Sequence, residues 1–82
     1  MELLVEQTIG ALLAVHRELG AGMSERVYAA AARFELEART IPFESEKVIP
    51  VRYRGAFLCN HRLDLFVDAK VVVEIFVAFV PS

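Results

Sequence analysis

Residues 61–76 read HRLDLFVDAKVVVEIF, a nearly continuous apolar run that contains two carboxylates, Asp64 and Glu74. The apolar residues on both sides of the tripeptide 68–70 are typical of two strands joined by a three-residue loop. With that loop, Val67 pairs with Val71, and counting back along both strands brings Asp64 directly opposite Glu74. The stretch therefore predicts an antiparallel hairpin with two facing acids.

Alternation along this hairpin predicts one apolar face and one mixed face. The apolar face holds Leu63, Leu65, Val67, Val71, Val73, Ile75 and Val77, and the mixed face holds Arg62, Asp64, Phe66, Val72, Glu74 and Phe76. Directly opposed like charges destabilise a sheet unless a cation or a shared proton relieves them. A bound Mg²⁺ ion, which takes one or two carboxylates as ligands, is one way to neutralise this repulsion. The alternative is that one acid pairs with Arg62 or lies at a solvent-exposed sheet edge. The hairpin alone does not decide between a metal site and this alternative.

The residues before the hairpin predict two helices. In residues 2–19, apolar positions recur at spacings of three and four, which indicates a helix with one buried stripe of Val5, Ile9, Leu12, Leu13, His16 and Leu19. A second helix is expected over residues 24–38, with Ser24 as N-cap and with Val27, Ala31, Phe34 and Ala38 on one face. His16 is then expected to be a packed core histidine.

Period-two alternation indicates strands at 44–53, 57–67 and 71–80, the first two joined around Arg54 and Gly55. Pro50 marks the first as an edge strand or a bulge. Cys59 is expected to be a small, half-buried strand residue. Lys47, Arg52 and Arg54 could contact phosphates, but charges on an edge strand are also ordinary protection against aggregation, which is the interpretation we favour here. The prediction is one α+β domain over residues 1–82, with two N-terminal helices packed on an antiparallel three-stranded sheet.

Composition narrows the functional classes. The chain has 82 residues, of which 56% are hydrophobic, which excludes disorder. Its net charge of −2 provides no global basic field, so nucleic-acid binding would need a local patch. A single cysteine allows neither an internal disulfide nor a zinc site, which makes a reducing cytoplasm the expected location. Residues 1–19 carry too many charges for a membrane helix and lack the basic start of a signal peptide.

Residues 22–28 read GMSERVY and match the signature GxxExxY. Together with VHRELGAGMSERVY, IPFESEKVIPVRYRG and RLDLFVDAKVVVE, this motif makes the chain resemble the GxxExxY protein family from about Ile9 to Glu74. That family is similar to the PD-(D/E)XK nuclease superfamily. The resemblance implies a restriction-endonuclease-like core, a nucleic-acid substrate and Mg²⁺. It also implies that Asp64 and Glu74 are the metal-binding acids and that Glu25 is the catalytic acid of the helix.

The chain departs from this pattern at three places. Phe76 stands at the position of the catalytic lysine, Glu46 stands where the family usually has glutamine, and the sequence stops at Ser82, where relatives continue with another strand and helix. The expectation is a truncated core with weak or no nuclease activity. For Glu25 and Tyr28, an exposed acid beside a half-buried tyrosine is the alternative to two residues at the edge of a cleft.

The alternative function is a non-catalytic module for oligomerisation or interaction, associated with nucleic-acid processing. The apolar tail FVAFVPS, residues 76–82, predicts a homo-oligomer formed through the last strand.

Overall fold

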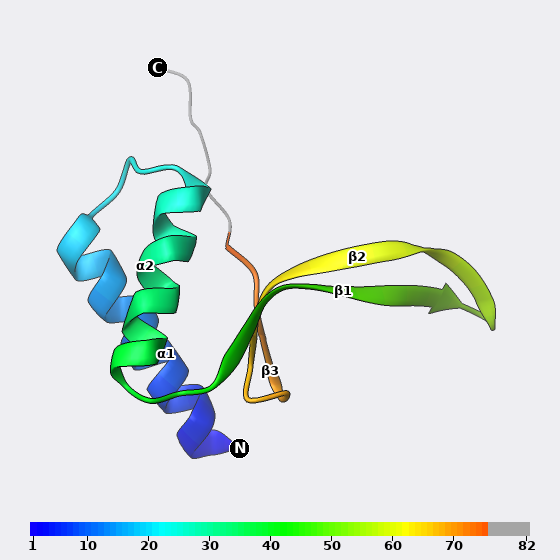
Figure 1. Cartoon of the computed structure of the whole chain (residues 1–82), viewed down its shortest axis with the longest axis horizontal. Helices are drawn as coiled ribbons and strands as arrows, with labels where there is room; N and C mark the ends of the chain where they lie inside the picture. Colours follow the sequence, from blue (N-terminus) through cyan, green and yellow to red (C-terminus); the bar gives the residue numbers. More distant parts are fainter. Residues whose placement is uncertain (76–82) are drawn as a thin grey trace.

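The structure, a computed structural model, describes residues 1–75. Two helices, α1 (Glu2–Leu19) and α2 (Glu25–Ala38), precede three strands, β1 (Phe43–Tyr53), β2 (Ala56–Val67) and β3 (Val71–Val73). The strands form one antiparallel sheet in the order β1-β2-β3, and the two helices lie together at one end of it (Figure 1). The α+β fold expected from the sequence is confirmed.

The hairpin of β2 and β3 has the register expected from the sequence. Val67 pairs with Val71, Phe66 with Val72 and Leu65 with Val73. Asp68 and Ala69 adopt positive φ values of 49° and 53°, which turn the chain within the three-residue loop. The third strand was expected to run to residue 80, but β3 ends at Val73. Glu74 and Ile75 are therefore not part of a strand, and the prediction is wrong for these two residues. The predictions for Phe76 and for the tail 76–82 lie outside the described residues.

The core lies where the helices meet the base of the sheet. It consists of Ala11, Ala32, Leu36, Ile41, Leu65, Val67 and Val73. Leu63, Leu65, Val67 and Val73 are all buried, which confirms the inner face expected for the β2–β3 hairpin. Burial of this apolar surface is the main force that holds so small a domain together.

The buried faces of the helices differ from those expected. In α1 the buried residues are Thr8, Ala11 and Val15, whereas Ile9 and Leu13 are about half exposed and His16 is exposed. The core histidine was therefore a wrong prediction. Ala11 and Ala32, which have small side chains, are both almost completely buried in the core, so at these positions the helices present alanines inward, whereas Ile9 and Leu13 face outward.

The same correction applies to α2. Its buried residues are Ala32 and Leu36, while Phe34 is 73% exposed and Val27 is 40% exposed. The expected stripe through Val27 and Phe34 is therefore on the wrong side of the helix.

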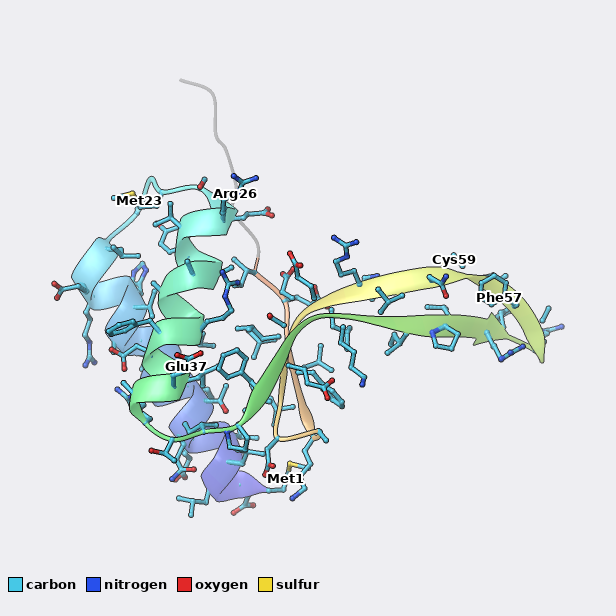
Figure 2. All side chains as sticks on the ribbon, in the orientation of Figure 1. Met1, Met23, Arg26, Glu37, Phe57 and Cys59 are labelled. Atoms are coloured by element: carbon cyan, nitrogen blue, oxygen red, sulfur yellow. The ribbon has the colours of Figure 1, made fainter. Side chains whose placement is uncertain are left out.

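The distal parts of β1 and β2 form an arm that extends away from the helices (Figure 1). We call residues 47–62 the arm. Its two strands are joined at Arg54 and Gly55, whose φ values of 50° and 83° fit a two-residue type I′ turn. Side chains leave both faces of the arm without cover from the helices, and Phe57 and Cys59 near its tip are exposed (Figure 2). The half-buried position expected for Cys59 is therefore wrong, whereas Pro50 does lie in the edge strand β1.

No helix within residues 1–75 has the length and apolar character needed to cross a membrane.

Candidate active site

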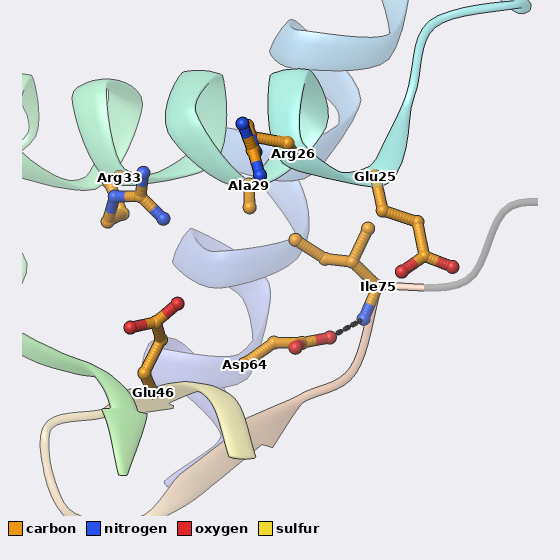
Figure 3. Close-up of a pocket in the computed structure, with 7 residues that line it drawn as sticks. All are labelled: Glu25, Arg26, Ala29, Arg33, Glu46, Asp64 and Ile75. Atoms are coloured by element: carbon orange, nitrogen blue, oxygen red, sulfur yellow. Dashed lines mark hydrogen bonds between the residues drawn. The ribbon is translucent and has the colours of Figure 1, made fainter. Parts of the chain in front are cut away.

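One cavity of about 210 Å³ lies between the N-terminal half of α2 and the sheet (Figure 3). Its lining consists of Glu25, Arg26, Ala29, Arg33, Glu46, Asp64 and Ile75. Three carboxylates and two guanidinium groups therefore face one open space. Asp64 and Glu25, two of the three residues expected to form the site, are brought together here.

Asp64 is half-buried, and its carboxylate has a specific partner. Its Oδ2 accepts a hydrogen bond of 2.6 Å from the backbone N–H of Ile75 (Figure 3). This bond lies just beyond the last pair of the β2–β3 ladder, Leu65 and Val73. Hydrogen bonds to ionised groups are shorter and stronger than neutral ones, so Asp64 also fixes the course of the chain after β3.

Glu74 lies elsewhere. Its Oε1 is 3.4 Å from Nε2 of His61, both side chains are about half exposed, and Glu74 does not line the cavity. His61 and Asp64 are three positions apart on β2, so their side chains leave opposite faces of the strand. Within residues 1–75, no three acidic, histidine or cysteine side chains are grouped so as to hold one metal ion. The prediction that the two acids face each other is therefore wrong for these side-chain positions, and their shared metal site stays a prediction.

Glu46 is a cavity residue that the sequence analysis did not place in the site. Ser45 pairs with Leu65 and Lys47 pairs with Leu63, which puts Glu46 opposite Asp64. Its φ of 55° is left-handed, a conformation that non-glycine residues adopt at an energetic cost and that is frequent at functional sites. The register alone would not have revealed Glu46, because a bulge between Val51 and Arg52 shifts the pairing by one residue.

Arg26 and Arg33 were also missed. They lie seven residues apart on α2, which puts them on one side of the helix together with Ala29. Guanidinium groups bind phosphate oxygens in a bidentate manner. A helical spacing of basic residues next to Glu25 was the signal in the sequence that could have indicated them.

The three defined residues of the GxxExxY segment have separate roles. Gly22 adopts a φ of 100° in the loop between the helices, a conformation that favours glycine. The Tyr28 hydroxyl donates a hydrogen bond of 2.5 Å to the carbonyl of Gly20 and accepts one of 3.2 Å from the N–H of Met23. Tyr28 therefore closes the loop from inside and does not line the cavity, so the expectation that it lies at the cleft edge is wrong. Of the three, Glu25 alone lines the cavity.

A sequence profile of the PD-(D/E)XK nuclease superfamily matches residues 2–78. The chain belongs to this superfamily. The match covers both helices, the whole sheet and every residue that lines the cavity. Comparisons with curated proteins and with solved structures find no match.

As a member of the PD-(D/E)XK nuclease superfamily, the chain has a nuclease-like domain, and such nucleases are generally dependent on divalent metals. Its carboxylates suit that metal chemistry, because Mg²⁺ binds through one or two carboxylates and completes its shell with water and phosphate oxygens. Arg62, which the sequence offered as a partner for one of the two acids, is exposed and does not line the cavity.

Proposed function

We propose that this chain is a nuclease-like domain that binds nucleic acid and Mg²⁺ at the cavity, with weak or no hydrolytic activity. The observation that supports this most directly is that Asp64 and Glu25 line one cavity in a member of the PD-(D/E)XK nuclease superfamily. Asp64 and Glu74 are the proposed metal ligands, and Glu25 is the proposed catalytic acid of the helix.

The charges in the cavity suit a phosphodiester. Arg26 and Arg33 can hold phosphate oxygens, while the carboxylate of Asp64 is already oriented by the N–H of Ile75. Glu74 is exposed, and within residues 1–75 its carboxylate contacts His61 at 3.4 Å, so sharing a metal ion with Asp64 requires its side chain to leave His61. When bound, Mg²⁺ would polarise the phosphate and acidify a bound water.

Phe76 is the reason to expect impaired hydrolysis. In the superfamily pattern this position carries a lysine, which orients the nucleophile and stabilises the developing negative charge. A phenylalanine side chain has neither a charge nor a hydrogen-bond donor. Loss of one such group typically slows a reaction by about 100- to 10,000-fold.

The metal site can be tested without any activity, through thermal unfolding with and without Mg²⁺. A ligand that binds only the folded state stabilises it by RT ln(1 + [L]/Kd), which is about 1.4 kcal/mol at roughly ten times Kd. We expect Mg²⁺ to raise the Tm of the wild type but not that of Asp64→Asn or Glu74→Gln. Asp64→Asn keeps an oxygen that can accept the N–H of Ile75, so it preserves the fold better than alanine.

Glu37→Gln is the matched control for these variants, because Glu37 is an exposed acid at the other end of α2 (Figure 2). It removes the same charge without touching the cavity. If Mg²⁺ stabilises all variants equally, the proposed metal site is wrong.

The proposed effect of Phe76 on hydrolysis has its own test. Phe76→Lys restores the lysine of the superfamily pattern, and we expect it to nick DNA or RNA in the presence of Mg²⁺ more quickly than the wild type does. The double variant Phe76→Lys with Asp64→Asn is the control for contaminating nucleases. A restored lysine that leaves the protein inert, while Mg²⁺ still binds, would contradict the account based on Phe76.

Exposed apolar residues on the helices favour a second candidate function, a non-catalytic interaction module. These residues are Ile9, Leu13, Val27 and Phe34, which are 50%, 46%, 40% and 73% exposed. Ile9 and Leu13 share one side of α1, and Val27 and Phe34 share one side of α2. Sedimentation at several protein concentrations tests it: an oligomer that Phe34→Ser weakens would support this function, and a monomer at all concentrations would contradict it.

A further inference from the structure

The charge of the arm is opposite to that of the rest of the chain. The chain has nine Lys and Arg and eleven Asp and Glu residues. The arm, residues 47–62, holds four of the cations, namely Lys47, Arg52, Arg54 and Arg62, and none of the acids. The remainder therefore has five cations against eleven acids. A net charge of −2 conceals this division, because the basic part is confined to one projecting hairpin.

The arginines of the arm are available to a ligand. Arg52, Arg54 and Arg62 are exposed, and within residues 1–75 none of them forms an ion pair. Lys47 is different, since its Nζ lies 2.9 Å from Oε2 of Glu44 just outside the arm. Three arginines that form no ion pair within residues 1–75 therefore lie on the arm, outside the acidic remainder of the chain.

Two of these arginines share one face of the arm. Val48 pairs with Arg62 and Arg52 pairs with Phe57, and directly paired residues point to the same side of a sheet. Val48 and Arg52 are four residues apart on β1, so they also share that side, about 13 Å apart along the strand. Arg62 and Arg52 therefore lie at the two ends of one face.

The third arginine occupies the tip. Arg54 adopts a φ of 50° in the type I′ turn, where asparagine or glycine is normally preferred. Its guanidinium lies 5.5 Å from the centre of the Tyr53 ring, and Tyr53 and Phe57 are 60% and 54% exposed. The tip thus combines a cation with two exposed aromatic rings, a combination suited to contacts with phosphates and bases.

Protection of the sheet edge does not account for this pattern. Charges of either sign hinder edge-to-edge pairing of strands, so protection alone would not exclude acids from the arm. A projecting element that carries positive charges and no negative ones instead attracts a polyanion.

We propose that the arm is a docking element for double-stranded DNA, with its two-stranded ribbon in the major groove. That groove is about 12 Å wide and admits a β-ribbon, whereas the major groove of A-form RNA is too deep and narrow to be read by side chains. Arg52, Arg54 and Arg62 contact phosphates, and Phe57, which shares the face of Arg52, faces the groove. The inference rests on the proposed function for its nucleic-acid partner, but the arm binds without the metal site.

The test is fluorescence anisotropy of a short labelled DNA duplex in EDTA, repeated over a range of salt concentrations. The logarithm of the affinity falls with the logarithm of the salt concentration, with a slope of about −0.9 per phosphate neutralised. We expect Arg54→Asn to make this slope shallower by about one and to weaken binding, while asparagine suits the left-handed turn and keeps Tm from falling. The triple variant Arg52→Gln, Arg54→Asn, Arg62→Gln should lose most of the affinity.

Arg17→Gln is the matched control, because it removes the same charge from an exposed position on α1, away from the arm. The duplex is titrated in EDTA, so this assay tests the arm without the metal site, and a failed Mg²⁺ titration and a failed arm are distinguishable. The proposal is overturned if the triple variant binds with unchanged affinity and slope, or if Arg17→Gln is as harmful as Arg54→Asn. Equal affinity for an RNA duplex would overturn the placement in the major groove. Loss of a dimer in the arm variants with DNA affinity unchanged would assign the arm to a second copy of the chain.

Discussion

Replacement of Tyr28 by phenylalanine removes one hydroxyl group and two hydrogen bonds from the loop between the helices. The bond to the carbonyl of Gly20 is 2.5 Å long and part-buried, whereas the bond from the N–H of Met23 is 3.2 Å long and exposed. Water can replace the exposed bond, so its loss costs little. The part-buried bond contributes about 1 kcal/mol to the free energy of unfolding, as a typical hydrogen bond does. Its loss costs more if the carbonyl of Gly20 is left without a partner.

We therefore expect Tyr28→Phe to lower the free energy of unfolding by about 1 to 1.5 kcal/mol. For a domain of this size that corresponds to a fall in Tm of roughly 5 to 10 °C. The assay is urea unfolding followed by far-UV circular dichroism. The midpoint should fall while the m-value stays the same, because the surface exposed on unfolding is unchanged.

Tyr53→Phe is the matched control, since it removes the same atom from a tyrosine that is 60% exposed. Within the described residues the Tyr53 hydroxyl makes no hydrogen bond. Its replacement should change the free energy of unfolding by less than about 0.5 kcal/mol. Equal effects of the two substitutions would refute the role of Tyr28 as the closure of the loop.

Two further predictions concern stability. Leu65 is completely buried in the core, so Leu65→Ala should destabilise the fold by about 2 to 5 kcal/mol in thermal unfolding, whereas Leu58→Ala, at a residue 58% exposed, should leave Tm nearly unchanged. Gly22→Ala should cost about 1 kcal/mol, because the φ of 100° disfavours a side chain although no atom lies within 4 Å of the added Cβ. A urea midpoint unchanged by Gly22→Ala would show that the loop does not need this conformation.

Much of the fold could be read from local patterns. The type I′ turn at Arg54 and Gly55 and the three-residue loop 68–70 follow from short-range signals, and together they define two hairpins. The register from Leu65 to Val73 was predicted correctly because the loop length determines which residues pair. Both helices were also predicted, with their ends at Gly20 and Ser24.

The candidate site was only partly predictable. Glu25 came from the GxxExxY motif and Asp64 from the hairpin and the family resemblance, and the cavity contains both, whereas Glu74 does not line it. Glu46 was not predicted, because an uninterrupted register from the turn at residues 54 and 55 would put it opposite Leu63. The bulge between Val51 and Arg52 moves it opposite Asp64, and a shift of one residue reverses which face a side chain occupies.

The sequence by itself determined the order of the elements, the two hairpins and the separation of charge between the arm and the body, because these depend on residues close together in the chain. Tertiary structure decided which side of each helix is buried. Apolar residues occur on several sides of α1, so periodicity alone allows more than one inward face, and the buried alanines Ala11 and Ala32 mark the one adopted. Tertiary structure also brought α2 to Asp64, because contacts between distant segments depend on how whole elements pack against one another.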